Sequence, residues 1–140
     1  MNRHTIPPKG INTYEFIYFV MIQDINEWLE KLKKFKGVII VEGPKDKKAL
    51  QNIAGMKKIF VLSKKPLYSV VEKIASETDK VVILTDLDRK GKELFARLRN
   101  HLQKHGITID DSFRDFLFKK THVSHIEGLE TYISKVRLEK

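Results

Sequence analysis

The sequence contains no cysteine among its 140 residues. This absence excludes disulfide bonds, thiolate metal sites and cysteine nucleophiles, and it suits the reducing cytoplasm, where we expect the protein to work. The chain also lacks a long apolar run. Its most apolar stretch, residues 16–22, is much shorter than the roughly 20 residues of a membrane-spanning helix. The sequence therefore predicts no membrane association and no signal peptide, for which a basic start and a small-residue cleavage site are missing.

The chain has fewer acidic than basic residues. The chain has 27 Lys and Arg against 18 Asp and Glu, which gives a formal net charge of +9. Such a surplus favours polyanionic partners such as DNA, RNA or an anionic membrane face. A charge-rich surface that only keeps the protein in solution explains the same number, and on charge alone the two interpretations stay open. Apolar residues make up 41% of the chain, enough to build the core of one domain.

Three short apolar runs alternate with helical patterns. The runs cover residues 38–41, 59–62 and 81–85, and helices are predicted over 44–53, from 66 onward and over 89–105. Strands that are apolar throughout indicate a parallel sheet covered on both faces. We therefore predict an α/β fold with a central, mostly parallel sheet of about four strands and helices on both faces.

The two ends of the chain differ from this regular centre. Residues 1–23 are interpreted as an N-terminal extension or an extra arm, because a regular helical pattern starts only near Asp24, where Asp24 and Glu27 resemble a capping box. Residues 24–140 are then one domain. Its core is expected at about 36–106, followed by a tail with helices over 111–119 and 126–136.

Acidic residues follow two of the apolar runs directly. Glu42 follows the first run, and Asp86 and Asp88 follow the third. Because the carboxyl ends of parallel strands meet at one edge of a sheet, these three carboxylates should converge. Two adjacent carboxylates repel each other unless a cation lies between them, and Mg²⁺ takes oxygen ligands while keeping water molecules that phosphate can replace. The sequence therefore predicts a Mg²⁺ site at this edge.

Basic residues surround the predicted acidic site. Cations beside a metal are what a phosphodiester site requires, because they hold the phosphates next to the reacting one. The candidates for binding nucleic acid are Lys45, Lys64, Lys65, Arg89, Lys90 and Lys92. A solvated helix face explains Lys45 and its neighbours Lys47 and Lys48 equally simply.

Other simple interpretations also remain. Asp46 suits the first helical turn through the helix dipole as well as it suits a metal site. Asp86 and Asp88 could be loop and N-cap residues. The pair His122 and His125 has a spacing seen in metal sites, but in a predicted loop these are better interpreted as surface histidines.

Two segments together resemble the Toprim domain family: VIIVEGPKD over residues 38–46, and VVILTDLDRKG over residues 81–91. The resemblance covers about residues 36–106 and is greatest to small stand-alone archaeal Toprim proteins. It implies a Rossmann-like Toprim fold, with Glu42 as general acid/base or metal-linked carboxylate. It further implies that Asp86 and Asp88 hold Mg²⁺, which Mn²⁺ can replace. Asp46 matches an acid seen in primase-like and nuclease-like members, which implies a role with a second metal, and Gly43 and Gly91 match the family's glycines.

The expected function is Mg²⁺-dependent cleavage or processing of RNA or DNA. The alternative is a nucleic-acid-binding or scaffold module without turnover, within a larger processing complex. Topoisomerase activity and autonomous primer synthesis are not expected, because the domains that supply a tyrosine nucleophile, a zinc finger or a helicase are missing. A homodimer is a further expectation for so small a domain.

Overall fold

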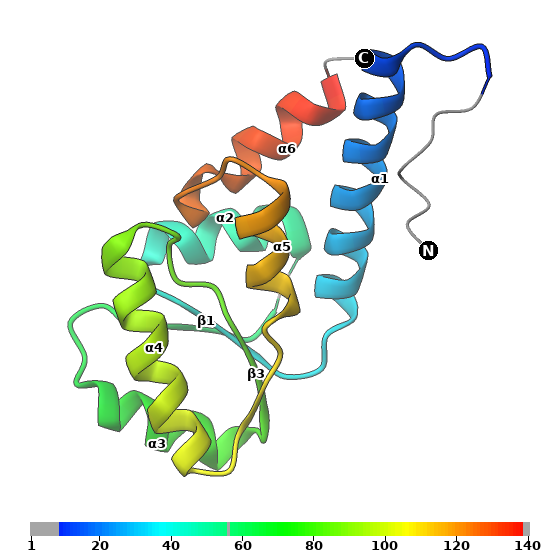
Figure 1. The fold of residues 1–140 in the computed structure, drawn as a ribbon. Helices are drawn as coiled ribbons and strands as arrows, with labels where there is room; N and C mark the ends of the chain where they lie inside the picture. Colours follow the sequence, from blue (N-terminus) through cyan, green and yellow to red (C-terminus); the bar gives the residue numbers. More distant parts are fainter. Residues whose placement is uncertain (1–8, 56, 139–140) are drawn as a thin grey trace.

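The centre of the fold is a four-stranded parallel sheet (Figure 1). The computed structural model describes residues 9–55 and 57–138. The strands are β1 Val38–Val41, β2 Ile59–Val61, β3 Lys80–Ile83 and β4 Thr108–Ile109. Their order is β2-β1-β3-β4, and each neighbouring pair is parallel. The predicted α/β fold is confirmed, with a sheet that is parallel in all its pairs.

Helices cover both faces of this sheet, as predicted (Figure 1). They are α1 Thr13–Lys34, α2 Pro44–Ala54, α3 Leu67–Glu77, α4 Arg89–Lys104, α5 Ser112–Lys120, the short 3₁₀ helix η1 Ile126–Gly128 and α6 Leu129–Leu138. Helices α3 and α4 contribute their buried residues to one hydrophobic cluster, and the other helices contribute theirs to a second. The sheet separates the two clusters.

The apolar strand sequences follow from this two-sided burial. Ile39 and Val41 of β1 belong to the cluster with α1, α2, α5 and α6, whereas Val38 and Ile40 belong to the cluster with α3 and α4. Successive residues of a strand point to opposite faces, so a strand covered on both sides has no solvent-facing position for a polar residue. All four residues are buried.

The connections place a crevice between β1 and β3. After β1 the chain enters α2, on the face of the α1 cluster, and after β3 it enters α4, on the opposite face. Because β1 and β3 are neighbours, the two connections separate at the carboxyl edge of the sheet. In open α/β sheets this switch point is where ligands bind.

The first helix begins earlier than the sequence analysis predicted. Asn12 is the N-cap of α1, and its side chain accepts a hydrogen bond of 2.8 Å from the Glu15 N–H. The predicted start at Asp24 is therefore wrong, because the cap that satisfies the free amides lies twelve positions earlier. The division at residue 23 stays a prediction about domains, and residues 1–8 lie outside the described part. Within that part, no helix combines the length and apolarity needed to cross a bilayer.

The C-terminal tail is built into the core. Its helices α5 and α6 are confirmed, and Leu117, Ile126 and Leu129 are fully buried in the same cluster as α1. The Trp28 Nε1–H of α1 donates a hydrogen bond of 3.0 Å to the Phe113 carbonyl of α5. The loop between α5 and η1 is held at the carboxyl edge of the sheet by a hydrogen bond of 2.8 Å from the Leu87 N–H to the Ser124 carbonyl, and it contributes to the site described next.

Candidate metal and nucleic-acid site

Glu42 and Asp86 meet where β1 and β3 end. Glu42 follows β1 directly, and its Oε1 accepts a hydrogen bond of 2.9 Å from the Asp86 N–H. The Glu42 carbonyl accepts a hydrogen bond, also of 2.9 Å, from the N–H of Ser63, which follows β2 in the chain. Three neighbouring strand ends are thus tied together, and the predicted convergence of acids at one edge is present.

Asp86 is held from the C-terminal tail. Its Oδ1 accepts a hydrogen bond of 2.8 Å from the Ile126 N–H, and its carbonyl accepts one of 2.9 Å from Arg114 Nη2. Arg114 packs over the Phe95 ring, and burial lowers the pKa of its guanidinium. Two tail residues therefore fix the loop that presents the Asp86 carboxylate.

Asp88 has two partners. Its Oδ1 accepts a hydrogen bond of 2.8 Å from the Gly91 N–H, which makes Asp88 the N-cap of α4, as the simpler interpretation of the sequence held. Its Oδ2 lies 3.2 Å from Nε2 of His125. Because only Oδ1 is used by the cap, Oδ2 can also bind a cation. The N-cap interpretation of Asp88 and the metal-ligand interpretation therefore do not exclude each other.

Gly91 allows the first turn of α4 to lie against the Asp86 backbone. A Cβ at Gly91 would be 1.9 Å from the Asp86 carbonyl oxygen and 2.4 Å from its carbon. The buried Thr85 hydroxyl donates a hydrogen bond of 2.9 Å to the Gly91 carbonyl. Gly43 differs, since an added Cβ would meet only Asp46 Oδ2, at 3.8 Å. The fold itself therefore requires glycine at 91 and not at 43.

Asp86, Asp88 and His125 form a group of potential metal ligands. One donor atom of each lies within 4.8 Å of the others. Two carboxylates and an imidazole are donors that divalent cations accept in proteins, and the two carboxylates fit the Mg²⁺ that the sequence predicts. Glu42 adjoins the group through the Asp86 amide, and its role as a ligand stays a prediction. His125 was interpreted as a surface histidine; it is exposed, but its position beside Asp88 was missed.

Asp46 supports the start of α2. It occupies the third position of the helix, and its Oδ2 accepts a hydrogen bond of 3.0 Å from the Gly43 N–H. This arrangement satisfies a free amide at the helix N-terminus, which agrees with the simpler of the two interpretations of Asp46. Its side chain is buried and lines the same cleft as Glu42. A role with a second metal stays a prediction.

The acids perturb one another. Burial raises the pKa of Glu42, and the negative charges of Asp86, Asp88 and Asp46 raise it further, against the lowering effect of the Asp86 N–H. Burial also raises the pKa of Asp46, with added repulsion from Asp86 and Glu127. Such crowding disfavours the ionised carboxylates unless a cation is present, and groups with perturbed pKa values concentrate at functional sites.

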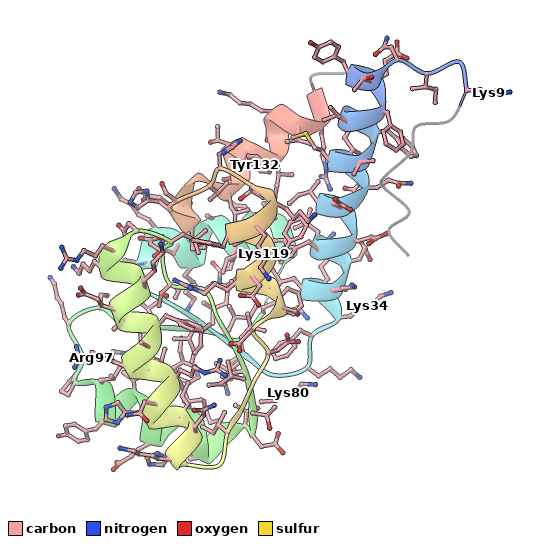
Figure 2. All side chains as sticks on the ribbon, viewed as in Figure 1. Lys9, Lys34, Lys80, Arg97, Lys119 and Tyr132 are labelled. Carbon is pink, nitrogen blue, oxygen red and sulfur yellow. The ribbon has the colours of Figure 1, made fainter. Side chains whose placement is uncertain are left out.

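The acids open onto a cleft of about 830 Å³. Its acidic lining consists of Glu42, Asp46, Asp86 and Glu127, and its basic lining consists of Lys45, Lys64, Lys65, Lys90 and Arg97. The four lysines were predicted, whereas Arg97, which projects from α4, was not (Figure 2). The cleft thus combines a carboxylate floor with a cationic rim, the combination that a phosphodiester backbone beside a metal requires.

Two of the predicted basic residues lie elsewhere. The Arg89 side chain is 94% exposed and forms an ion pair of 3.3 Å with Glu93, one turn along α4. Lys92 lies over the Phe118 ring, 4.8 Å from its centroid. Neither lines the cleft, so any contact of these two residues with nucleic acid is a prediction that depends on a ligand extending beyond the cleft.

Lys64 adopts a left-handed backbone conformation on the rim of the cleft, with φ of 62°. This conformation costs a residue with a Cβ about 1–2 kcal/mol and costs glycine almost nothing. We therefore expect Lys64→Gly to be less destabilising than Lys65→Gly by about 1 kcal/mol. Urea denaturation of both variants measures the difference, and because each variant loses one lysine, charge is matched. Equal losses of stability would mean that the conformation at Lys64 is unstrained.

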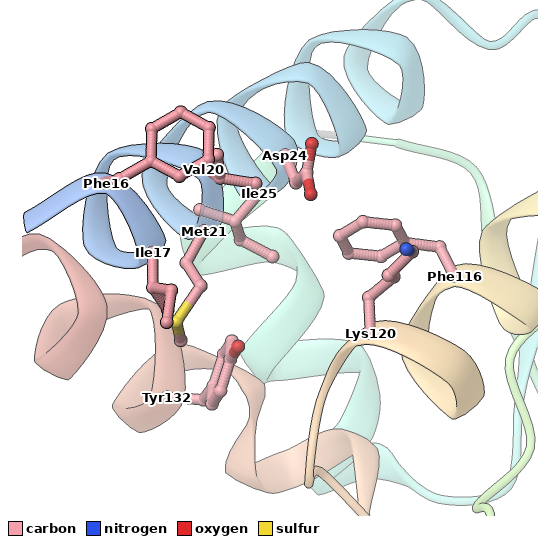
Figure 3. Close-up of a pocket in the computed structure, with 9 residues that line it drawn as sticks. All are labelled: Phe16, Ile17, Val20, Met21, Asp24, Ile25, Phe116, Lys120 and Tyr132. Carbon is pink, nitrogen blue, oxygen red and sulfur yellow. The ribbon is translucent and has the colours of Figure 1, made fainter. Parts of the chain in front are cut away.

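A second, smaller hollow of about 200 Å³ lies between α1, α5 and α6 (Figure 3). Its lining is mainly apolar: Phe16, Ile17, Val20, Met21, Ile25, Phe116 and Tyr132, with Asp24 and Lys120 at its edge. Burial raises the pKa of Tyr132 there. The hollow has no converging group of acids, so the chemistry of this protein is assigned to the cleft at the sheet edge.

Comparison with known proteins gives consistent results. A UPF0292 protein of Thermococcus onnurineus is 42% identical over 104 residues, covering 74% of this chain and 77% of that protein. A UPF0292 protein of Pyrococcus horikoshii is 41% identical over 112 residues, covering 79% and 84%. A solved structure, a putative protein from Aquifex aeolicus, is similar with a TM-score of 0.69 and 37% identity, over 74% of this chain and 95% of that one.

The Toprim domain matches residues 37–117, which include β1 to β4, the acids at the strand ends and most of α5. The matched segment is more than half of the chain and contains Glu42, Asp86 and Asp88. The residues on which the sequence resemblance rested are therefore the ones that the fold brings together. The chain belongs to the Toprim domain family, whose members bind a divalent metal, usually Mg²⁺, and act on nucleic acid.

Proposed function

We propose that this protein cleaves or processes phosphodiester bonds in RNA or DNA, with Asp86 and Asp88 holding a divalent metal and Glu42 as general acid/base. One observation carries the proposal: the Glu42 carboxylate has a raised pKa and is bonded to the backbone of Asp86, at the floor of a cleft rimmed by cations. The proposal thus assigns a proton donor, a metal site and a phosphate-binding surface to one region of the fold.

Each group has a distinct task in this reaction. Asp86 and Asp88 would hold the Mg²⁺, which would supply Lewis-acid polarisation of a phosphate oxygen and activation of water. Glu42 takes up or releases the proton, and a pKa raised toward neutrality improves a carboxylate for that work. Lys64, Lys65 and Arg97 bind the phosphates on either side of the scissile one through charge-assisted hydrogen bonds. Arg114 keeps the Asp86 backbone in place.

A second candidate is a module that binds nucleic acid without cutting it. The observation that favours it is the cationic rim of the cleft, which suits retention of a phosphate backbone as well as its cleavage. In this candidate the protein would act within a larger processing complex. A homodimer is compatible with both candidates.

Cleavage and binding assays test the proposal and separate the two candidates. We expect labelled RNA or DNA to be cut in the presence of Mg²⁺ or Mn²⁺ and left intact with a chelator. Binding should weaken steeply between 50 and 200 mM salt, because phosphate contacts release counterions. Binding without cleavage of any substrate would favour the binding module. Affinity that is unchanged across the salt titration would remove nucleic acid as the partner.

The metal site gives a separate prediction. We expect Mg²⁺ to raise the thermal stability of the wild type, by the equivalent of about 2.7 kcal/mol at a concentration one hundred times Kd. Asp86→Asn/Asp88→Asn should lose this increase, because the amides keep oxygen acceptors for Ile126 and Gly91 but lack the charge that binds the ion. Differential scanning fluorimetry with and without Mg²⁺ measures it.

The matched control for that experiment is Glu72→Gln/Asp79→Asn, which removes two negative charges from exposed positions on the α3 side of the fold. It should keep the full stabilisation by Mg²⁺. An equal loss in both double variants would mean that Mg²⁺ stabilises the protein through its overall charge and not through Asp86 and Asp88.

A further inference from the structure

We propose that Nε2 of His125 is a third protein ligand of the metal held by Asp86 and Asp88, and that this nitrogen makes the site prefer Mn²⁺ over Mg²⁺. The inference rests on the metal site of the proposed function and goes beyond it by naming a further ligand and the ion that it selects. It concerns a residue from the loop that joins α5 to η1, after the Toprim match ends at residue 117.

The backbone on both sides of His125 is bonded to the Asp86–Asp88 segment. The Ser124 carbonyl accepts a hydrogen bond of 2.8 Å from the Leu87 N–H, and the Ile126 N–H donates one of 2.8 Å to Asp86 Oδ1. The Ile126 side chain is fully buried in the core. His125 is therefore held by an anchor at each neighbour, and its ring is directed toward Asp88 by this local pairing.

The distances suit shared coordination. His125 Nε2 lies 3.2 Å from Asp88 Oδ2, and one donor atom from each of the three residues lies within 4.8 Å of the other two. Ligands at about 2.1 Å from an octahedral ion are about 3.0 Å apart when adjacent. The His125–Asp88 pair already has nearly that spacing, so only small side-chain rotations would bring the three donors onto one ion.

The other ring nitrogen has its own partner. Nδ1 of His125 lies 2.9 Å from the Ser124 hydroxyl oxygen. When Nδ1–H donates to this oxygen, the lone pair of the neutral ring is on Nε2, which is the form that binds metals. Histidine ligands commonly have such a partner on the second nitrogen, because it fixes the tautomer and the ring orientation. In that tautomer, the Ser124 contact leaves the Nε2 lone pair available to a metal.

A simple ion pair between His125 and Asp88 is the competing explanation of the same contact. Both side chains are about half exposed, and pairs of this kind contribute little to stability. The Ser124 contact is compatible with this ion pair, because an imidazolium donates from both nitrogens. The hydrogen bonds of Leu87 and Asp86 to the chain on both sides of the ring place it beside two carboxylates.

The added nitrogen changes the choice of ion. Mg²⁺ binds oxygen ligands and dehydrates reluctantly, so a site made only of Asp86 and Asp88 suits it well. Imidazole binds transition metals more readily than it binds Mg²⁺. Mn²⁺ is a transition metal, and it also accepts carboxylates and the same octahedral geometry. A site with two carboxylates and one imidazole should therefore bind Mn²⁺ more tightly than Mg²⁺.

The test compares His125→Ala with His122→Ala, an exposed histidine of the same loop. Calorimetric titration of the full chain with MnCl₂ and with MgCl₂ should show that His125→Ala weakens Mn²⁺ binding by at least the roughly 10- to 100-fold that loss of an outer-shell partner costs, and Mg²⁺ binding far less. His122→Ala should match the wild type with both ions. Pulsed electron paramagnetic resonance of bound Mn²⁺ should show coupling to a nitrogen nucleus in the wild type and in His122→Ala, and none in His125→Ala.

The outcomes separate this inference from the proposed function. Tight Mn²⁺ binding without nitrogen coupling, unchanged in His125→Ala, would overturn the role of His125 while leaving the Asp86–Asp88 site intact. Mn²⁺ binding that survives in Asp86→Asn/Asp88→Asn would instead overturn the metal site on which both proposals rest. Thermal melting without metal shows whether each variant is folded, and nitrogen coupling in the wild type supports His125 even if His125→Ala fails to fold.

Discussion

We expect Gly91→Ala to lower the free energy of unfolding by more than about 3 kcal/mol, or to prevent folding altogether. A Cβ at this position would lie 1.9 Å from the carbonyl oxygen of Asp86 and 2.9 Å from its Cα. These are backbone atoms, so no side-chain rotation can relieve the overlap. Either α4 must move away from the end of β3 or the Asp86 loop must shift.

The same overlap should damage the site. Moving the Asp86 loop disturbs the amide that binds Glu42 and the carbonyl that accepts from Arg114, so any Gly91→Ala protein that folds should also bind metal weakly. Gly128→Ala is the matched control, because a Cβ there meets no atom within 4 Å. Urea denaturation with metal titration measures both effects. Wild-type stability in Gly91→Ala would show that the close approach of α4 to Asp86 is not required.

The part of the site that follows strand ends could be predicted from the sequence. Apolar runs without alternation indicate a parallel sheet, and in such a sheet residues that follow β1 and β3 meet at one edge. Glu42 and Asp86 are consequently in hydrogen-bond contact although 44 positions separate them. Lys64, Lys65 and Lys90 line the cleft for the same reason, since the connection after each strand begins at that edge.

The contributions of the tail could not be predicted in this way. Arg114 and His125 reach the site through the packing of α5 on α1 and of η1 on α2, tertiary contacts that have no local sequence signal. Arg97 lines the cleft because of the rotation of α4, which charge patterning alone does not define. Strand β4 has only two residues, Thr108–Ile109, too few to form a recognisable pattern.

The start of α1, which the sequence analysis missed, does have a sequence signal. The segment from Asn12 to Glu15 has a cap residue followed three positions later by an acid, the same pattern that was assigned to Asp24 and Glu27. Aromatic and aliphatic residues over 16–22 obscured the periodicity of the following turns. Two of the large residues at the start of α1, Tyr14 and Phe19, are exposed, so this part of the helix is less amphipathic than the part that packs on the core.

The second large effect is expected from Glu42→Gln, which should lower the rate of cleavage about 10²- to 10⁴-fold, the usual contribution of general acid–base catalysis. The substitution is nearly isosteric, and the amide oxygen of Gln can still accept the hydrogen bond from the Asp86 N–H. Nucleic-acid affinity, which depends on the basic rim, should change little. Single-turnover cleavage and filter binding at the same salt concentration measure the two quantities. Cleavage at the wild-type rate would exclude Glu42 as the acid/base.

Stability as a function of pH provides an independent readout for the same variant. Because the pKa of Glu42 is raised in the folded state, the ionised carboxylate opposes folding: wild-type stability is fully present below the unfolded-state pKa and declines as pH rises through the folded-state pKa. Glu42→Gln removes this decline. With a chelator present, the variant should therefore melt higher than the wild type at neutral pH and at the same temperature in acid. A variant that is more stable and yet inactive would show that the partly buried charge of Glu42 serves the reaction and not the fold.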